Sequence, residues 1–344
     1  PIYSLVLTLI MTPEQAIMCA QPFFTTPIDT CNVVEGSGNN RLFKVSSAGQ
    51  PYALKWYPEQ SSDTRDRLNT EFKALTFLTS NGNFPCPKAL FADSTKQIAL
   101  YEWVDGERPE QIQDVHIDAA IDFVESLYTI SKSDAAFENN MASESCLSLN
   151  ILETQIKGRF EHLRSVSKEH PALEKFLKTT FQPLFERTMA DAIAGYQIAG
   201  LSKEQDIGTS QRTLSSSDFG FHNTLVNSTK GVVFIDFEYF GWDDPVKLLS
   251  DFLLHPGMSP SAKQCEKFYT KVSAIFSADP EFITRFRLQF PLFALRWSMI
   301  LLSEFLPERL HRRKLAGFTM DAREKQSIQL AKAKTILKRV VYDA

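Results

Sequence analysis

The sequence lacks the marks of several common protein classes. Its five cysteines are widely scattered over 344 residues, odd in number, and include no CxxC pair. This spacing predicts neither a disulfide framework nor a structural zinc site, and it favours a reducing cytoplasm. The 41 acidic residues outnumber the 37 basic ones, which argues against a general nucleic-acid binder. No internal repeat and no low-complexity segment is found.

A long hydrophobic run is also missing. The opening stretch PIYSLVLTLIM is apolar but about half as long as a bilayer span, so no membrane span is expected. It has no basic segment in front of it, which argues against a signal peptide. Residues 1–27 are therefore expected to form an N-terminal extension packed on the surface. The oligomeric state is not indicated by any pattern.

What is present indicates a sizeable core divided between two lobes. Hydrophobic residues make up 43% of a chain whose length suits two lobes better than one core. Residues 28–104 hold three strand-like runs, a helical stretch and two more strand-like runs. Residues 105–344 are mostly helical in pattern, apart from short strands predicted in residues 212–237. Gly106 and Pro109 mark the boundary between the two lobes.

A lysine lies in the middle of an apolar strand-like run. In YALKWY the alternation places Lys55 on the same face as Tyr57. A desolvated lysine needs an anionic partner, unless it lies on an edge strand and reaches solvent. Glu71 lies on the apolar side of the following helical stretch, between Leu68 and Leu75. We therefore predict an ion pair that presents the ammonium group to polyphosphate oxygens; the alternative is an ordinary, partly exposed glutamate.

The stretch EGSGNN places Gly36, Ser37 and Gly38 between two strand-like runs. Their backbone N–H groups could close over phosphates. The G-x-G pattern is equally typical of a plain hairpin turn, and it gains weight only from the lysine and glutamate that follow. No G-x-x-x-x-G-K-[ST] occurs, so a Walker-type phosphate loop is excluded.

Three oxygen-bearing side chains follow or precede short apolar runs in the second lobe. Asp218 follows TLSSS, Asn223 precedes TLVN, and Asp236 ends VVFID, with STKG as the turn of a predicted hairpin. A carboxylate in such a loop can orient or deprotonate an alcohol. Asn223 and Asp236 offer the hard oxygen ligands that Mg²⁺ prefers, and magnesium commonly offsets charge in phosphoryl transfer. Each residue alone is also typical of an Asx turn.

Together and in this order, the lysine, the glutamate, the aspartates and the asparagine resemble the site of the kinase-like small-molecule phosphotransferases, which include aminoglycoside phosphotransferases and choline kinases. SSDFGFHN (residues 216–223) is similar to their catalytic loop, H-x-D-x-x-x-x-N. IDFEY (residues 235–239) is similar to their I-D-x-E metal motif. GWDDPVKLLSDFL (residues 241–253) resembles their Gly-Asp-Pro followed by a helical Asp. The resemblance covers residues 28–256.

The resemblance implies a bilobal, protein-kinase-like α+β fold. It has a small five-stranded antiparallel N-lobe with one helix and a larger, mostly helical C-lobe. ATP is the implied phosphate donor and Mg²⁺ the implied cofactor. Asp218 is then the catalytic base or orienting carboxylate, Asn223 and Asp236 are metal ligands, and the helical Asp251 braces the catalytic loop.

The resemblance also assigns the nucleotide-binding residues. Lys55, held by Glu71, would bind the α- and β-phosphates beneath the loop of residues 36–38. The stretch YEWVDGE would be the hinge against which adenine packs, at Glu102 and Val104.

One position departs from the family pattern. Ser216 stands where the family has a histidine, two residues before the catalytic aspartate. That histidine mainly supports the loop, so its replacement removes no reacting group. It leaves open a pseudokinase, a nucleotide-binding module with a regulatory role. His222 does not fill the missing position and is predicted to be a loop or packing residue.

The acceptor is expected to be a small hydroxylated molecule. Only FEYFGWDD separates Asp236 from Pro245, which leaves no room for the activation segment of a protein kinase. A sugar, an amino alcohol and an aminoglycoside all stay open, because the candidate acceptor ligands carry both signs. They are Asp243, Asp244, Glu304, Arg296, Arg312, Arg313 and Lys314. The basic ones alternatively form the solvated end of a helix.

Overall fold

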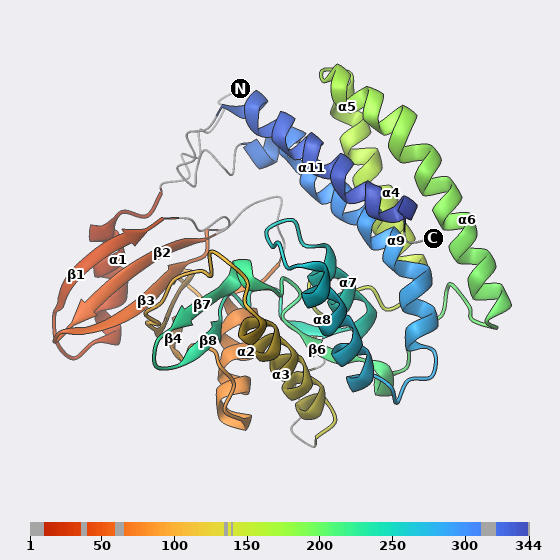
Figure 1. Cartoon of the computed structure of the whole chain (residues 1–344). Helices are drawn as coiled ribbons and strands as arrows, with labels where there is room; N and C mark the ends of the chain where they lie inside the picture. The colour runs from red at the N-terminus through yellow and green to blue at the C-terminus, as the bar shows by residue number, and fades with distance from the viewer. Residues whose placement is uncertain are drawn as a thin grey trace.

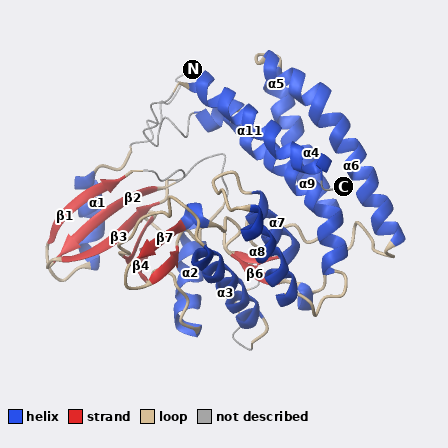
Figure 2. Ribbon diagram, in the orientation of Figure 1, coloured by secondary structure: helices blue, strands red, loops and turns tan. Residues whose placement is uncertain are grey.

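The computed structural model describes residues 10–35, 40–58, 65–133, 137–138, 140–310 and 321–342. The predicted phosphate loop with Gly36, Ser37 and Gly38 lies outside the described residues, as do Arg312, Arg313 and Lys314. The described chain forms one lobe that carries a sheet and one that is mostly helical (Figures 1 and 2). The predicted bilobal α+β fold is therefore confirmed. None of its described helices is long and apolar enough to cross a membrane.

The N-lobe is built on one antiparallel sheet of five strands. In chain order these are β1 (Ile28–Val34), β2 (Arg41–Ser47), β3 (Gln50–Trp56), β4 (Ala89–Asp93) and β5 (Ile98–Glu102). Their order in the sheet is β1-β2-β3-β5-β4, so β3 is central. Lys55 pairs with Leu42 on one side and with Ala99 on the other. The alternative of an edge-strand lysine is therefore wrong, and Lys55 needs its partner inside the protein.

The helix predicted after the third strand is α2 (Arg67–Asn81). Asp66 caps it, because its Oδ1 accepts a hydrogen bond from the Asn69 N–H at 3.2 Å. Leu68 and Leu75 are buried on one face, and Glu71 is buried with them. The 3.6-residue period of the helix thus places the Glu71 carboxylate on the same side as the apolar residues.

A second helix, α1 (Pro13–Ala20), packs against β1, β2 and β5 of the sheet. Its N-terminus is a capping box: the Gln15 N–H donates to Thr12 Oγ1 at 3.3 Å, and the Thr12 N–H donates to Gln15 Oε1 at 2.8 Å. Ala16 and Ala20 are fully buried and form one cluster with β-strand residues such as Phe43. Part of the extension predicted for residues 1–27 is thus a second helix on the N-lobe, where the sequence predicted one.

The C-lobe is a helical assembly around α9 (Phe282–Leu301). Four helices pack on α9: α4 (Leu149–Ser167), α6 (Gln182–Ile198), α7 (Pro245–Leu254) and α11 (Ala322–Tyr342), the last running beside it in Figure 1. Helices α3 (Asp114–Ser131) and α8 (Ala262–Ile275) pack on each other. The short α5 (Pro171–Phe176) passes through a π-helical turn (Leu177–Phe181) into α6. Pro183 at the start of α6 has no N–H to donate, which accounts for the irregular turn.

The hairpin predicted in residues 212–237 is only partly correct. Strands β7 (Thr224–Asn227) and β8 (Gly231–Phe234) form it. Strand β6 (Thr213–Ser215) pairs instead with β9 (Gly241–Asp243), in a separate sheet. Strand β6 has only three residues, so its own sequence pattern does not determine which strand it pairs with. The packing of residues 241–243 against it does. The loop that carries Asp218 therefore runs between two small sheets.

Aromatic rings form the core beneath this loop. The ring of Phe123 on α3 lies 5.6 Å from that of Phe219 and 4.5 Å from that of Phe234, centroid to centroid. Phe123 is 1% exposed. Helix α3 thus supports both the loop before β7 and the end of β8.

We expect Phe123→Ala to lower the free energy of unfolding by about 3–5 kcal/mol, because it leaves a cavity among closely packed rings. Urea unfolding followed by circular dichroism measures the change. Val115→Ala, on the same helix at a side chain that is 59% exposed, is the control and should shift the value by less than about 0.5 kcal/mol. Equal effects of the two substitutions would contradict this account of the core.

Candidate active site

The lysine, the glutamate and the second aspartate predicted from the sequence meet between the lobes. Lys55 Nζ lies 2.7 Å and 2.9 Å from the two carboxylate oxygens of Glu71. It also lies 3.0 Å from Asp236 Oδ1. Strand β3 supplies the lysine, α2 the glutamate, and the segment after β8 the aspartate. The predicted Lys55–Glu71 pair is present, and it is joined to a carboxylate of the other lobe.

Burial determines how these charges behave. Desolvation alone would lower the pKa of Lys55, but the carboxylates of Asp236 and Glu71 outweigh it, and the net shift is upward. Burial raises the pKa of Glu71, and the Lys55 ammonium offsets part of that rise. The Tyr57 hydroxyl donates to Glu71 Oε2 at 2.6 Å and lies 2.9 Å from the Tyr101 hydroxyl. The ammonium group is therefore charged and fixed in position.

Asp236 is the carboxylate of this cluster that faces outward. Glu71, Asp236 and Glu238 each place a carboxylate oxygen within 4.8 Å of the others. The side chain of Asp236 is 31% exposed, whereas those of Glu71 and Glu238 are 2% and 1% exposed. Glu238 accepts a hydrogen bond from Asn40 at 3.3 Å and lies 3.9 Å from Arg67, and burial raises its pKa to about 7. Glu238 therefore anchors the segment, and Asp236 is the residue available to a ligand.

The loop between β6 and β7 brings Asp218 and Asn223 together. Asn223 Nδ2 donates to the main-chain oxygen of Asp218 at 3.0 Å and to its Oδ2 at 3.3 Å. The side-chain nitrogen of Asn223 thus donates within the loop. Its side-chain oxygen, Oδ1, is a hard ligand and takes no part in these two bonds. The main-chain oxygen of Asn223 accepts from the Ile235 N–H at 3.0 Å. This bond ties the loop to the strand end that carries Asp236.

Two histidines face Asp218. His222 Nε2 lies 3.0 Å from Asp218 Oδ1, and His255 Nε2 lies 3.6 Å from it. The two imidazole rings stack with centroids 3.7 Å apart, and the Trp297 ring meets His255 edge-on at 4.8 Å. His222 is the loop residue that was predicted and packs on His255, and it also bonds the predicted catalytic carboxylate, a contact that the sequence did not indicate.

These neighbours keep Asp218 ionised. Burial would raise the pKa of Asp218, but the hydrogen bond and charge of His222 outweigh it and lower the pKa to about 2. Burial lowers the pKa of His255 to about 3, and the adjacent His222 adds to that effect. At neutral pH the charged carboxylate of Asp218 thus faces the neutral imidazole of His255.

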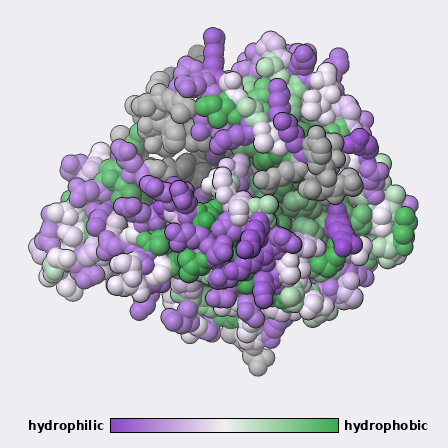
Figure 3. All heavy atoms as spheres, in the orientation of Figure 1, coloured by the Kyte–Doolittle hydropathy of each residue, from purple (hydrophilic) through white to green (hydrophobic). Residues whose placement is uncertain are grey.

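The predicted hinge residues lie where the lobes connect. Glu102 ends β5, and its side chain pairs with Lys230 of the β7–β8 turn. Val104 is buried. Two residues on, Gly106 has a φ of 150°, and a Cβ there would lie 2.7 Å from the main-chain oxygen of Val226. Glycine is needed for this close approach of the linker to β7. In the space-filling view the surface is hollowed between the two lobes (Figure 3).

The charged residues considered as acceptor ligands are buried in ion pairs instead, within the described part of the chain. Asp243, Asp244, Arg296 and Glu304 are each less than a twentieth exposed. The pairs are Asp243–Lys247, Asp244–Arg285, Arg296–Glu144 and Glu304–Arg309. Helical periodicity indicates which side of a helix a charge lies on, but it does not reveal whether that side is solvated. These residues are therefore not available to an acceptor.

Asp251, implied to brace the loop, does so only through another residue. Its Oδ1 accepts from Trp297 Nε1 at 2.8 Å, and its Oδ2 lies 3.2 Å from Lys247 Nζ. Lys247 in turn reaches the loop at Ser217.

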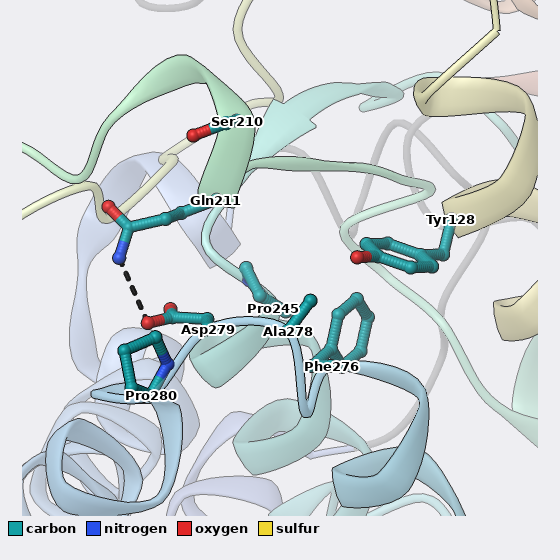
Figure 4. Close-up of a pocket in the computed structure, with 8 residues that line it drawn as sticks. All are labelled: Tyr128, Ser210, Gln211, Pro245, Phe276, Ala278, Asp279 and Pro280. Atoms are coloured by element: carbon teal, nitrogen blue, oxygen red, sulfur yellow. Dashed lines mark hydrogen bonds between the residues drawn. The ribbon is translucent and has the colours of Figure 1, made fainter.

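A cavity of about 320 Å³ lies elsewhere in the C-lobe (Figure 4). The rings of Tyr128 and Phe276 border it on one side, and Gln211, hydrogen-bonded to Asp279, borders it on the other. None of the predicted site residues lines this cavity.

With this geometry in view, the comparisons with known proteins identify the family. The family model described as "Phosphotransferase enzyme family" matches residues 30–258, which include both halves of the site. The chain belongs to this phosphotransferase family. Among curated proteins, none matches the sequence significantly.

Solved structures extend the likeness of this phosphotransferase over nearly the whole chain. A spectinomycin phosphotransferase in complex with ADP and spectinomycin has a TM-score of 0.60 at 11% identity, over 94% of this chain and 99% of its own. An ADP-bound aminoglycoside phosphotransferase has a TM-score of 0.58 at 14% identity, over 95% and 99%. Choline kinase from Cryptosporidium parvum has a TM-score of 0.57 at 13% identity, over 96% of each chain. At such identities the likeness shows a shared fold, and the predicted kinase-like fold is confirmed.

Two residues of the phosphotransferase site were not predicted. Glu238 lies in the quoted metal motif, so the I-D-x-E pattern was the signal, but its burial was not visible in the sequence. His255 follows α7, 37 residues after Asp218, and carries no motif. Its contact with the loop arises from tertiary packing alone.

Proposed function

We propose that this phosphotransferase transfers the γ-phosphate of ATP to a hydroxyl group of a small molecule. The observation that carries the proposal is the meeting of Lys55, paired with Glu71, and the outward-facing Asp236. The loop with Asp218 and Asn223 is tied to the same strand end. One fixed cation, two partly exposed carboxylates and an amide oxygen form the set that phosphoryl transfer requires.

The N-lobe residues would bind the nucleotide. Lys55 Nζ, held by Glu71, donates to the α- and β-phosphate oxygens as a point charge. The backbone of Gly36, Ser37 and Gly38 is proposed to cover the phosphates. The adenine ring would lie against Glu102 and Val104, at the connection between the lobes.

The donor set fits Mg²⁺. Asp236 offers a partly exposed carboxylate, and Asn223 offers an amide oxygen whose nitrogen is already bonded within the loop. Both are the hard oxygen ligands that Mg²⁺ prefers. When bound, Mg²⁺ would offset the negative charge on the phosphates during transfer. We therefore propose Asn223 and Asp236 as its protein ligands.

Asp218 would position and accept the proton of the acceptor hydroxyl. Its pKa, lowered by His222, keeps it charged at neutral pH. A base of low pKa is a weak proton acceptor early in the reaction, so orientation of the hydroxyl is its main contribution before the proton moves. This division suits a loose phosphoryl transition state, in which proton transfer is late.

The acceptor would be small. Residues 237–244 between the proposed metal aspartate and α7 form a short connection that includes β9 and is mostly buried, which argues against a docking platform for peptides. The solved relatives include proteins named for spectinomycin and for choline, so sugars, amino alcohols and aminoglycosides are the classes to test. All five cysteines are free thiols, which supports the proposed cytoplasmic location.

The acceptor class can be measured directly. The protein is incubated with MgATP and separate pools of sugars, amino alcohols and aminoglycosides, and ADP release above the no-acceptor rate is recorded. We expect release that depends on one pool and on magnesium. ATP binding without acceptor-dependent release from any pool would favour a pseudokinase, and label transferred only to protein would favour a protein kinase.

A further inference from the structure

We propose that Lys247 is a positioning residue for phosphoryl transfer: it holds Ser217 by a hydrogen bond and thereby fixes the neighbouring Asp218. This inference rests on the proposed function, because it concerns the same loop. The observations that carry it are the burial of Lys247, its partners, and the backbone conformation at Ser217.

Lys247 is a buried lysine that contacts the loop and two carboxylates beside it. Its side chain is 1% exposed. Its Nζ lies 3.0 Å from Asp243 Oδ2, 3.2 Å from Asp251 Oδ2 and 3.0 Å from Ser217 Oγ. Three partners match the three donors of an ammonium group. A lysine used only for charge balance would need the two carboxylates and not the hydroxyl.

The charge on Lys247 is secured by the same carboxylates. Burial would lower the pKa of Lys247, but Asp243 and Asp251 outweigh it, and the net shift is upward. The hydrogen bond to Ser217 Oγ is therefore charge-assisted, which makes it roughly twice as strong as a neutral one.

Ser217 needs such a restraint. Its φ is 63°, in the left-handed region that non-glycine residues rarely adopt. The Asp218 N–H donates to the Ser216 main-chain oxygen at 2.8 Å, across Ser217, so the chain makes a tight turn there. The Ser217 hydroxyl also donates to the Ser143 main-chain oxygen at 3.0 Å. A strained turn directly before Asp218 persists only where the surroundings hold it.

The neighbouring serine does not provide this support. Ser216 stands where the related catalytic loops carry a histidine, yet its Oγ is buried and has no hydrogen-bond partner within the described part of the chain. The loop is therefore restrained at Ser217, one residue later, by Lys247 of α7. Of these two adjacent serines, Ser217 Oγ thus has two hydrogen-bond partners, Lys247 and Ser143, and Ser216 Oγ has none among the described residues.

The test compares alanine at these two serines in the full-length protein. With the acceptor pool that supports transfer, we expect Ser217→Ala to lower kcat roughly 10-fold or more, from loss of a charge-assisted hydrogen bond. The KM for ATP should change less than about twofold, because Lys55 and the hinge are untouched. Ser216→Ala, the matched control, should leave kcat within about twofold.

Two further variants separate the hydrogen bond from backbone strain and from folding. Ser217→Gly removes the hydroxyl without the cost of a positive φ, and it should lose as much activity as Ser217→Ala. In Lys247→Met, Ser217→Ala should lower kcat by a smaller factor than it does in the wild type, because the bond to Lys247 is already gone and only the bond to Ser143 is left to lose. If Lys247→Met does not fold, since it leaves Asp243 and Asp251 unpaired, the three serine variants decide.

The outcomes distinguish this inference from the proposed function. Wild-type transfer together with equal kcat values for Ser217→Ala and Ser216→Ala would overturn the role of Lys247 and leave the enzyme assignment intact. A loss that appears only in KM, or only in the melting temperature, would also overturn it, because a positioning residue acts on kcat. Absence of transfer by the wild type would instead contradict the proposed function itself.

Discussion

The Asp218→Asn variant is expected to lose about 10³-fold in kcat while binding MgATP as tightly as the wild type. Asparagine has the same shape, so the contacts with His222 and Asn223 can largely persist. It has neither the negative charge that attracts the acceptor proton nor the capacity to take it. The nucleotide contacts belong to other residues, so affinity for MgATP should not change.

Steady-state transfer rates and calorimetric titration with a non-hydrolysable ATP analogue measure the two quantities on the same protein samples. Asp191→Asn, at an exposed position of α6, makes the same chemical change away from the site and should behave as the wild type. Transfer undiminished in Asp218→Asn would show that Asp218 neither orients nor deprotonates the acceptor.

Asp236→Asn is expected to lower kcat/KM for MgATP by about 100-fold and to raise the Mg²⁺ concentration needed for half-maximal rate. The substitution removes the charged member of the proposed ligand pair. Lys55 stays fixed, because both of its bonds to Glu71 remain. The loss should therefore shrink as Mg²⁺ is increased, which a general disruption of the lobe interface would not produce.

The measurement is a series of Mg²⁺ titrations at constant ATP, with Asp191→Asn as the matched control. A titration curve for Asp236→Asn that coincides with that of the wild type would refute the assignment of Asp236 as a metal ligand. A loss independent of Mg²⁺ would assign Asp236 to the anchoring of Lys55 instead.

Local periodicity was enough to predict the Lys55–Glu71 pair. Alternation along YALKWY places Lys55 on one face of a strand, and the 3.6-residue period places Glu71 on the apolar side of the next helix. The side of the strand on which Lys55 lies and the side of the helix on which Glu71 lies depend only on near neighbours in the chain. The tertiary fold therefore does not change them. The motif spacing likewise places Asp218 and Asn223 in one loop, where the structure finds them in contact.

Contacts between distant segments could not be predicted in this way. His255 reaches Asp218 because α7 ends beside the loop, and Lys247 reaches Ser217 across the same interface. Arg296 looked like a ligand for an anionic acceptor, but packing of α9 against α4 and α7 buries it with Glu144. Whether a charge in a helix is solvated or paired depends on which helices surround it, and the sequence pattern of one helix does not contain that information.

The central claim is that the phosphate of ATP moves to a small hydroxylated acceptor at Asp218. Phosphorus NMR of the reaction with the responsive acceptor pool tests it most directly. The account predicts a phosphomonoester resonance that grows one-for-one with ADP, requires Mg²⁺, and is absent in Asp218→Asn. ADP accompanied only by inorganic phosphate, or a phosphomonoester formed equally by Asp218→Asn, would contradict it.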